Sequence, residues 1–446
     1  THHRTGTGYL RRAGRAVPQG GLTMARKMKD SGIEWIGEIP EGWEVAPLKR
    51  FASIQTGNTP TKTSDSNYYA STGIPWIKPD NLGYSHSISK TSEYLTSEGA
   101  LCARIMPPNT VYVCCIGSLG KVGYSSISCA CNQQINALIF NDLMFWKYGY
   151  YLTIAQESQY LLFGNGNVLQ IINSTSQGNI ACVLPPLENQ HLIACYLDSV
   201  CSDIEVLISK TRSSIEEYKK LKQAVITQAV TKGVRGEREM KDSGVEWIGK
   251  IPKEWDILNL VAHTSMLTPM RDRPENLDGP IPWIRIEDFD GKYISSSKAS
   301  LGVSKETVRS MNLKIYPVGT ILCTSSCIMG KCAIVSRELV SNQRFIGIIP
   351  DQNTCENFLY YLMLSNSERM NYLATGALQA NLSRSSFEHL KVQFPSYQEQ
   401  KEISDYLDTK CAEIEKLIAK KEQLVKELES YKKSLIYEVV TGKREV

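Results

Sequence analysis

The sequence predicts an α+β protein with two similar globular domains and two long helices that pair as an antiparallel coiled coil. Three observations support this prediction. A unit of about 210 residues is duplicated in tandem, the first part of each unit has short β-rich runs broken by turn residues, and the second part is a proline-free amphipathic stretch. Of the 446 residues, 42% are hydrophobic and 22% are charged, which is typical of a folded globular protein.

The duplication is clearest at the start of each unit. Residues 28–37 (MKDSGIEWIG) recur as 240–249 (MKDSGVEWIG), and 74–78 (IPWIK) recur as 281–285 (IPWIR). Shorter pairs follow at the same spacing, among them Gly120-Lys121 with Gly330-Lys331 and Asn132-Gln133 with Asn342-Gln343. Solenoid repeats have periods of roughly 20–50 residues, so this longer period indicates that a whole domain with its helix was copied.

The repeats set the expected domain boundaries. These are a tail over 1–27, a globular domain over 28–186, a helix and linker over 187–239, a second globular domain over 240–396 and a distal helix over 397–446. The tail has neither hydrophobic periodicity nor the apolar segment of a secretory signal, so we expect a disordered leader or a cloning-derived tail. Within the domains, 105–114 and 315–323 have strand patterns and 357–365 a helical one.

Both helical stretches repeat apolar residues at alternating spacings of three and four, which is the pattern of a coiled-coil seam. The predicted seam residues are Leu197, Ile204, Leu207, Tyr218 and Leu221 in the first helix and Leu407, Ile414, Leu417, Leu424 and Leu428 in the second. A lone amphipathic helix usually covers a larger core, but two helices related by a repeat favour pairing with each other. The first helix leads into the second domain and the second helix follows that domain, so we expect the pair to be antiparallel.

Charge and cysteine content limit the classes of protein only broadly. The formal net charge of +4 neither requires nor excludes a nucleic-acid partner, and no apolar run reaches the roughly 18 residues of a membrane span. The cysteine pairs Cys129/Cys131 and Cys323/Cys327 lack a second pair or a nearby histidine at zinc-binding spacing. We therefore expect no membrane contact and no metal site, and buried, reduced thiols in a cytoplasmic protein.

Several short motifs occur in the same order in the chain and, in part, in its second copy. They are the repeated Gly-x-Glu-Trp-Ile-Gly-x-Ile-Pro-x-x-Trp opening, 56–60 (TGNTP) followed by 73–78 (GIPWIK), the Gly120-Lys121 turn, the Asn132-Gln133 pair, and 186–190 (PLENQ) before the long helix. With these motifs and the duplicated helices, the sequence resembles the specificity subunit of type I restriction-modification systems from Met24 onward. The second copy is looser, as in Thr268-Pro269 and 395–400 (PSYQEQ).

The resemblance implies two target recognition domains, each reading one half of a bipartite site on double-stranded DNA. The helices would set the number of unread base pairs and dock two methyltransferase (M) subunits. At about 1.5 Å per residue, a helix over 187–232 spans roughly 65–70 Å, more than the roughly 34–36 Å of one DNA turn. S-adenosylmethionine, ATP and Mg²⁺ would bind to the M subunits and to restriction (R) subunits, and the complex would be an adenine-N6 methyltransferase and ATP-dependent endonuclease of a prokaryotic cytoplasm. This chain would bind none of these cofactors.

We predict no catalytic residues in the chain. It lacks the Asn/Asp-Pro-Pro-aromatic motif of adenine methyltransferases, and 117–121 (GSLGK) lacks the spacing and the Ser/Thr of a phosphate loop. The acidic segment 287–292 (EDFDGK) could suggest a nuclease, but a solvated turn explains it. Two alternatives to a specificity subunit remain: a stand-alone DNA-modifying enzyme and a sequence-blind coiled-coil adaptor.

The DNA-binding candidates are side chains that match base edges or phosphates. Arg and Lys suit guanine, and Asn and Gln suit adenine. The candidates are Lys78, Lys121, Asn132, Gln133, Gln134, Asn165, Asn167 and Gln170 in the first domain, and Arg285, Lys331, Asn342, Gln343, Arg344, Gln379, Asn381 and Arg384 in the second. An equally good interpretation of the amide clusters is that they cap or cross-link strands. For Lys78 and Arg285, phosphate contact and simple surface exposure stay open.

Overall fold

The computed structural model describes residues 26–60, 67–83, 87–164, 170–269, 273–326, 330–374 and 382–446. It divides into two compact units, unit 1 (Thr1–Ser209 with Lys426–Val446) and unit 2 (Lys210–Val425). Each unit combines one globular domain with part of each long helix, α5 (Leu187–Lys232) and α10 (Tyr397–Val440). In the described part of the chain, no helix is long and apolar enough to cross a membrane.

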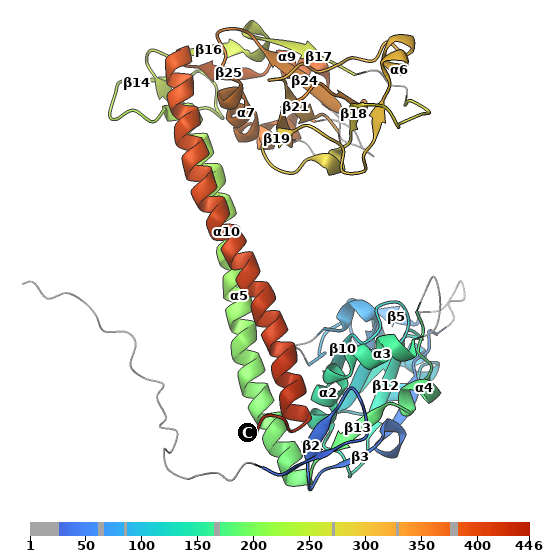
Figure 1. The fold of residues 1–446 in the computed structure, drawn as a ribbon. Helices are drawn as coiled ribbons and strands as arrows, with labels where there is room; N and C mark the ends of the chain where they lie inside the picture. Colours follow the sequence, from blue (N-terminus) through green and yellow to red (C-terminus); the bar gives the residue numbers. More distant parts are fainter. Residues whose placement is uncertain are drawn as a thin grey trace, which may run out of the picture. The chain divides into compact units, whose positions relative to one another are not determined.

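The globular domain of unit 1 contains two main sheets (Figure 1). The first is antiparallel with strand order β10-β9-β12-β4, formed by Val122–Ser125, Thr110–Cys114, Ile135–Phe140 and Ala52–Thr56. The second has the order β5-β7-β6-β11-β8, formed by Tyr69–Ala70, Tyr94–Leu95, Ile74–Ile77, Cys129–Cys131 and Ile105–Met106. Two further strand pairs are β1 (Met28–Asp30) with β2 (Glu38–Pro40) and β3 (Glu44–Pro47) with β13 (Ala181–Leu184).

Short helices complete this domain. They are α1 (Ser97–Leu101), α2 (Trp146–Ala155), α3 (Glu157–Phe163) and α4 (Ser174–Gly178), with 3-10 turns η1 (Leu48–Arg50) and η2 (Pro79–Asn81). Apolar side chains of strands β9, β11 and β12 pack into a core that includes Tyr112, Cys114, Cys131 and Ile135. Ten of the twelve described cysteines are buried and all twelve are free thiols. Burial raises the pKa of Cys115 to about 12, so this thiol stays protonated and acts as a small apolar side chain.

Unit 2 repeats this plan with altered edges. Its larger sheet has the order β17-β24-β21-β22-β19, formed by Thr264–Leu267, Phe345–Pro350, Ile321–Thr324, Cys332–Val335 and Tyr293–Ile294. A smaller sheet has the order β20-β18-β23 (Gly302–Val303, Ile281–Ile284, Val340–Ser341). The strand pairs are β14 (Met240–Asp242) with β15 (Lys250–Pro252) and β16 (Asp256–Asn259) with β25 (Lys391–Phe394). The helices are η3 (Leu260–Ala262), η4 (Ile286–Asp288), α6 (Lys305–Ser310), α7 (Glu356–Ser365), α8 (Ser367–Leu373) and α9 (Arg384–Glu388).

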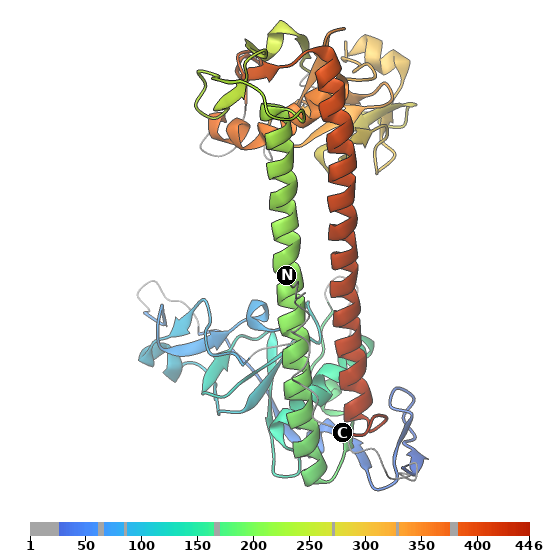
Figure 2. The same cartoon turned by 90° about the vertical axis from the view of Figure 1, so that its left-hand side faces the viewer.

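The long helices run antiparallel in each unit (Figure 1 and Figure 2). In unit 1, Glu205 of α5 forms an ion pair with Lys432 of α10, and Tyr196, earlier on α5, interacts with Arg444, later in the chain. In unit 2, Lys222 forms an ion pair with Glu415, whereas Tyr218, earlier on α5, lies under Lys421, later on α10. The two ion pairs are related by the repeat, since Lys222 corresponds to Lys432 and Glu205 to Glu415.

The seam between the helices differs from the predicted seam at alternate positions. Leu197, Ile204, Leu407 and Ile414 are buried, and Tyr218 and Leu428 are half-buried. Leu207, Leu221, Leu417 and Leu424 are instead 52%, 48%, 41% and 43% exposed, so they lie outside the buried seam. In each case the next residue along the chain takes the place in the seam. Ile208 and Val425 are buried, Ile418 is half-buried, and Lys222 forms an ion pair with Glu415. At three of these four positions the predicted seam residue and the residue after it are both apolar. The sequence pattern therefore fits two heptad assignments.

A buried glutamine fixes the start of each long helix to its own domain. Gln190 accepts a hydrogen bond from the backbone N–H of Phe145 (2.7 Å) and donates to the carbonyl groups of Leu143 and Pro185. Gln400 makes the same three bonds, to Cys355, Asn353 and Pro395.

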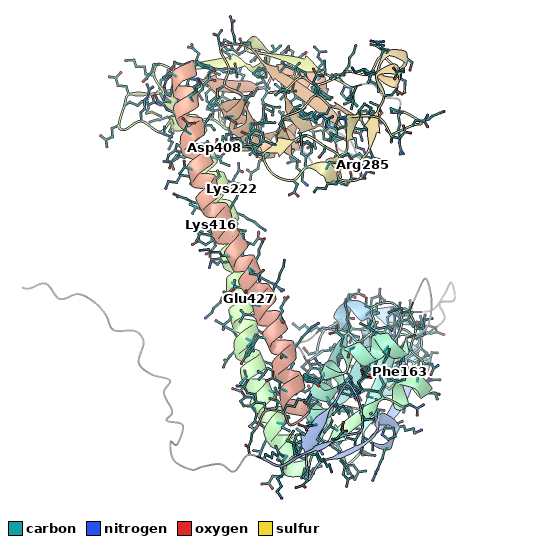
Figure 3. The ribbon with its side chains drawn as sticks, in the orientation of Figure 1. Phe163, Lys222, Arg285, Asp408, Lys416 and Glu427 are labelled. Carbon is teal, nitrogen blue, oxygen red and sulfur yellow. The ribbon has the colours of Figure 1, made fainter. Side chains whose placement is uncertain are left out.

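About two turns further on, an aspartate adds a second attachment of each helix to its domain. Tyr151 donates to Asp198 (2.8 Å) in unit 1 and Tyr361 donates to Asp408 (2.6 Å) in unit 2. Figure 3 labels Asp408 on α10. Each helix therefore has a fixed rotation relative to its own domain.

Candidate nucleic-acid interface

In unit 1, four chain segments meet at one edge of the β10-β9-β12-β4 sheet, and we call them the loop edge of unit 1: residues 57–59, 115–121, 132–134 and 170–172. The backbone N–H of Cys115 donates to Gln134, and the carbonyl of Cys115 accepts from Ile172 (2.8 and 3.0 Å). Gly117 donates to the carbonyl of Gln170, and Asn58 donates to Cys131, both at 3.0 Å. Loops far apart in sequence thus form one surface.

Lys121 lies on the loop edge because Gly120 precedes it. Gly120 has φ +78°, and a Cβ atom there would lie 3.2 Å from Cγ of Glu157. Glycine is therefore the residue that allows this tight turn against α3. The Lys121 side chain is exposed, and no partner for its ammonium group is found in the described part of the chain. It is available to a phosphate.

The amide cluster at 132–134 divides into two kinds of residue. Asn132 is 8% exposed; its Oδ1 accepts from the N–H of Gln134 (3.1 Å) and its Nδ2 donates to Gln134 Oε1 (3.0 Å). Asn132 therefore serves the turn, as the strand-capping interpretation expects. Gln133 is exposed and accepts a hydrogen bond from the Thr59 hydroxyl. Of this cluster, Gln133 is the side chain best placed to meet a base.

The other candidates of the first domain are less open. Lys78 Nζ lies 3.0 Å from Glu93 and 4.9 Å from the centroid of the Trp76 ring, so its charge is already paired. Gln170 is exposed, and its carbonyl belongs to the loop edge. Asn165 and Asn167 lie outside the described residues, as do Gln379 and Asn381 of the second domain.

Unit 2 contains the corresponding loop edge: residues 325–326, 330–331, 342–344 and 382–384. The backbone N–H of Ser325 donates to Arg344, and the carbonyl of Ser325 accepts from Leu382 (2.8 and 2.9 Å), in the places of Gln134 and Ile172. Gly330 has φ +81°, and a Cβ atom there would lie 2.3 Å from Cβ of Ser367. The exposed Lys331 follows it.

The side chains on this second edge differ from those on the first. Oδ1 of Asn342 accepts from the N–H of Arg344 (3.0 Å), as in the first copy, and Gln343 and Arg344 are exposed. Arg384 pairs with Glu388 (2.7 Å) one turn along α9. Arg285 lies 4.0 Å from Glu287 and contributes its backbone N–H to Asp288. The backbone frame of the edge and the exposed Lys and Gln side chains (Lys121 and Lys331, Gln133 and Gln343) are shared between the copies, whereas the half-buried Gln134 is replaced by the exposed Arg344.

Sequence reasoning missed Arg104 on the first edge. Its Nη1 donates to the carbonyl of Thr56 (2.7 Å), and its backbone N–H donates to Oδ1 of Asn58 (2.8 Å). Asn58 in turn donates to Cys102 (2.7 Å), so this exposed arginine is attached to the loop edge. The TGNTP motif at 56–60 was the available signal, because it supplies both partners.

In the acidic segment 287–292, Glu287 and Asp290 are exposed, as expected for a solvated turn, but Asp288 is buried. Asp288 is 5% exposed, and its carboxylate accepts from the backbone N–H groups of Arg285 (2.7 Å) and Lys298 (2.8 Å) and from Ser297. It therefore ties η4 to the following loop. Among the described residues, no group of three or more His, Cys, Asp or Glu side chains could hold a metal ion.

Comparisons with known proteins give this architecture its class. Residues 40–217 and 256–427 each match the family described as the type I restriction modification DNA specificity domain. The chain belongs to this family, in two tandem copies.

Two relatives come from Methanocaldococcus jannaschii. The chain is 34% identical to the type I restriction enzyme MjaIX specificity subunit over 181 residues, which is 39% of this chain and 41% of that relative. It is 24% identical to the MjaVIII specificity subunit over 426 residues, 91% of this chain and 93% of that relative. A solved structure from work on assembly and conformational transition of the type I R-M system has the same fold, with a TM-score of 0.70 and 12% identity over 91% of this chain and 99% of that chain.

Proposed function

We propose that this chain is the DNA-specificity subunit of a type I restriction-modification complex in a prokaryotic cytoplasm. Each globular domain would read one half of a bipartite site on double-stranded DNA through its loop edge. The observation that carries the proposal is the duplicated loop edge, in which Cys115 and Ser325 make corresponding backbone bonds and an exposed Lys and Gln recur, while Gln134 of unit 1 is replaced by Arg344 in unit 2. A shared frame with different residues at some exposed positions suits two different half-sites.

The chemistry would belong to other subunits. The helix pair would set the unread spacing and dock two M subunits that use S-adenosylmethionine for adenine-N6 methylation. R subunits would supply ATP- and Mg²⁺-dependent translocation and cleavage. Leu207, Leu221, Leu417 and Leu424 support the docking role, because they are exposed apolar side chains on the helices and a protein partner would remove them from water.

Methylome sequencing tests the function directly. Cells expressing this chain with its M subunit should acquire a bipartite methyladenine motif that is absent when the chain is deleted. Methylated DNA without a bipartite motif would reject the proposal. Methylation by the purified chain alone would favour the stand-alone enzyme, and binding that weakens with salt but ignores sequence would favour the adaptor.

A domain exchange provides the sharper test. Replacing residues 240–396 with the matching domain of another specificity subunit should change one half-site and leave the other half-site and the spacing unchanged. The reciprocal exchange of 28–186 is the matched control, because it should change only the other half-site.

A further inference from the structure

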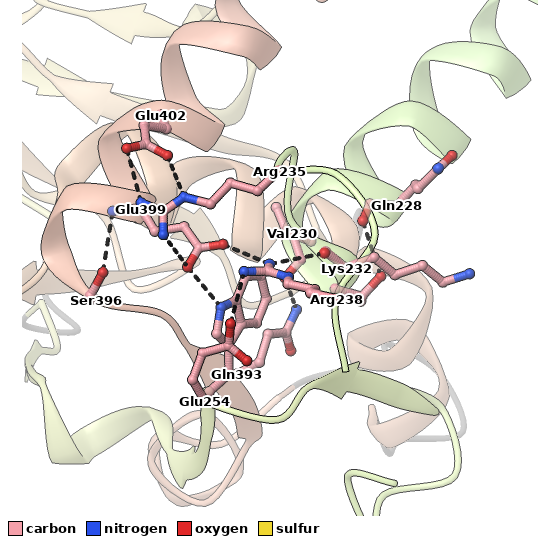
Figure 4. A network of polar contacts seen from close by, with 12 residues as sticks. Gln228, Val230, Lys232, Arg235, Arg238, Glu254, Gln393, Ser396, Glu399 and Glu402 are labelled. Atoms are coloured by element: carbon pink, nitrogen blue, oxygen red, sulfur yellow. Dashed lines mark hydrogen bonds and ion pairs between the residues drawn. The ribbon is translucent and has the colours of Figure 1, made fainter. Parts of the chain in front are cut away.

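Unit 2 contains a buried carboxylate where α10 begins, and Figure 4 shows its contacts. Glu399 is 2% exposed and lies 2.6 Å from Nη2 of Arg238. It also accepts a hydrogen bond from Nε1 of Trp255 (3.1 Å), and Arg238 lies over the Trp255 ring, 5.2 Å from its centroid. An arginine, an indole N–H and the first turn of a helix thus surround one carboxylate.

Unit 1 repeats these surroundings without the carboxylate. Arg26 lies over the Trp43 ring, 4.9 Å from its centroid, in the place of Arg238 over Trp255. The residue in the place of Glu399 is Asn189, in the first turn of α5. In the described part of the chain, nothing forms an ion pair with Arg26 and nothing accepts a hydrogen bond from Nε1 of Trp43. The Trp43 side chain is 2% exposed, so this N–H is buried and unsatisfied.

A cavity of about 380 Å³ occupies this position. Its lining includes Arg26, Trp43 and Asn189 together with Arg444, Glu445 and Val446. An unsatisfied buried donor normally costs free energy, and an arginine without a counterion favours an anion. The partial positive charge at the start of α5 acts in the same direction.

We propose that this cavity is a carboxylate-binding site, in which a bound carboxylate takes the position that Glu399 occupies in unit 2. One oxygen would accept from Nε1 of Trp43, and the group would pair with Arg26. The carboxylate comes from a free small carboxylic acid or from an acidic side chain of a bound protein. Residues 1–25 contain no Asp or Glu and cannot supply such a side chain. The site does not depend on DNA recognition.

Indole NMR of the full chain tests the site. The chain has seven tryptophans, so the indole N–H signals are few and Trp43→Phe identifies that of Trp43. Sodium acetate should move the Trp43 signal downfield and saturably, whereas sodium chloride at equal ionic strength should not. Trp255 is the internal control, because Glu399 already accepts its N–H bond. No saturable shift of Trp43, or an equal shift with chloride, overturns the proposal.

Substitutions at Asn189 add a matched pair. Asn189→Glu should move the indole N–H signal of Trp43 downfield, to the shift of a hydrogen-bonded indole, without acetate, and acetate should then cause no further shift. Asn189→Gln should keep the acetate-induced shift. Arg26→Met should weaken acetate binding at least tenfold. In Glu445→Gln the response should persist. If instead Trp43 is already hydrogen-bonded in the natural chain and loses that bond in Glu445→Gln, Glu445 is the acceptor and the proposal fails.

Binding to the M subunits separates the two sources of carboxylate. If a protein side chain occupies the cavity, Asn189→Glu should weaken that binding about tenfold relative to Asn189→Gln. If a free acid occupies it, the two variants should bind the M subunits equally. Either result is compatible with a carboxylate site that the acetate titration has established. The comparison shows which kind of carboxylate occupies it.

Discussion

At the scale of single residues, breaking the buried Glu399–Arg238 pair should destabilise unit 2. The side chains of Glu399 and Arg238 are 3% and 13% exposed, so loss of the negative charge leaves a nearly buried cation. Its remaining partners are the more exposed Glu254 (3.5 Å) and the carbonyl of Lys232 (3.0 Å). Breaking such a pair typically costs about 3–5 kcal/mol. We expect Glu399→Gln to lower the free energy of unfolding by about 3 kcal/mol, measured by urea denaturation.

An exposed pair in the same unit is the control for this prediction. Lys253 and Glu239 lie 2.6 Å apart, but their side chains are 67% and 77% exposed. Glu239→Gln should therefore change the free energy of unfolding by less than about 1 kcal/mol. Equal effects of the two substitutions would show that burial does not determine the energetics of these pairs.

The neighbouring Arg235–Glu402 pair should make part of the stability depend on pH. Arg235 donates two hydrogen bonds to Glu402 (2.7 and 2.9 Å), which lowers the pKa of that carboxyl below its ordinary 4.5. The contribution is present above pH 4.5 and is lost as the pH falls through the lowered folded-state pKa. In urea titrations, Glu402→Gln should be less stable than the natural chain at pH 7, and the difference should shrink as the pH falls below 4.5. A difference that stays constant with pH would contradict this.

At the scale of the elements, the helix seam makes a prediction that separates the two heptad assignments. Ile215 is 6% exposed and Leu221 is 48% exposed, although the sequence pattern placed Leu221 in the seam. Ile215→Ala should lower the free energy of unfolding of the isolated chain by about 2–5 kcal/mol. Leu221→Ala should change it by about 0.5 kcal/mol or less. Urea denaturation of both variants decides between the assignments, and the reverse order would restore the predicted seam.

The helices themselves could be predicted from sequence because periodicity and the absence of proline are local properties. The residues that are buried in the seam could not be predicted from sequence. Leu207 and Ile208 are adjacent apolar residues, and packing against the partner helix determines which of them is buried. The charge of Lys222 favoured Leu221 as the seam residue at this step. Lys222 nevertheless takes that place, because it forms an ion pair with Glu415. Local patterns do not record such a distant partner.

The loop edges show the same division between local and distant information. The positive-φ turns at Gly120 and Gly330 could be predicted, because a Gly-Lys pair between strands is a local signal. The turn-forming role of Asn132 and the position of Arg104 depend on segments far away in sequence, so they needed the structure. The roles of the exposed side chains in DNA reading stay predictions.

At the scale of the whole molecule, the duplicated helices should act as a ruler. Inserting one heptad in each helix, in register, adds about 10.5 Å and keeps the same side chains in the seam. The methylated motif should then gain about three unread base pairs and keep both half-sites. Methylome sequencing of the rebuilt complex measures the spacing. Unchanged spacing would reject the ruler, and insertion of a heptad in one helix only is the control, because it disrupts the pairing.

The buried glutamines that attach each helix to its own domain have a consequence for DNA topology. Because Gln190 and Gln400 fix the rotation of each helix relative to its domain, an added heptad turns a domain by only about 20°. Three added base pairs turn the grooves of the double helix by about 100°. The lengthened protein should therefore match underwound DNA. It should methylate negatively supercoiled plasmid faster than relaxed plasmid, and the natural chain should show a smaller preference.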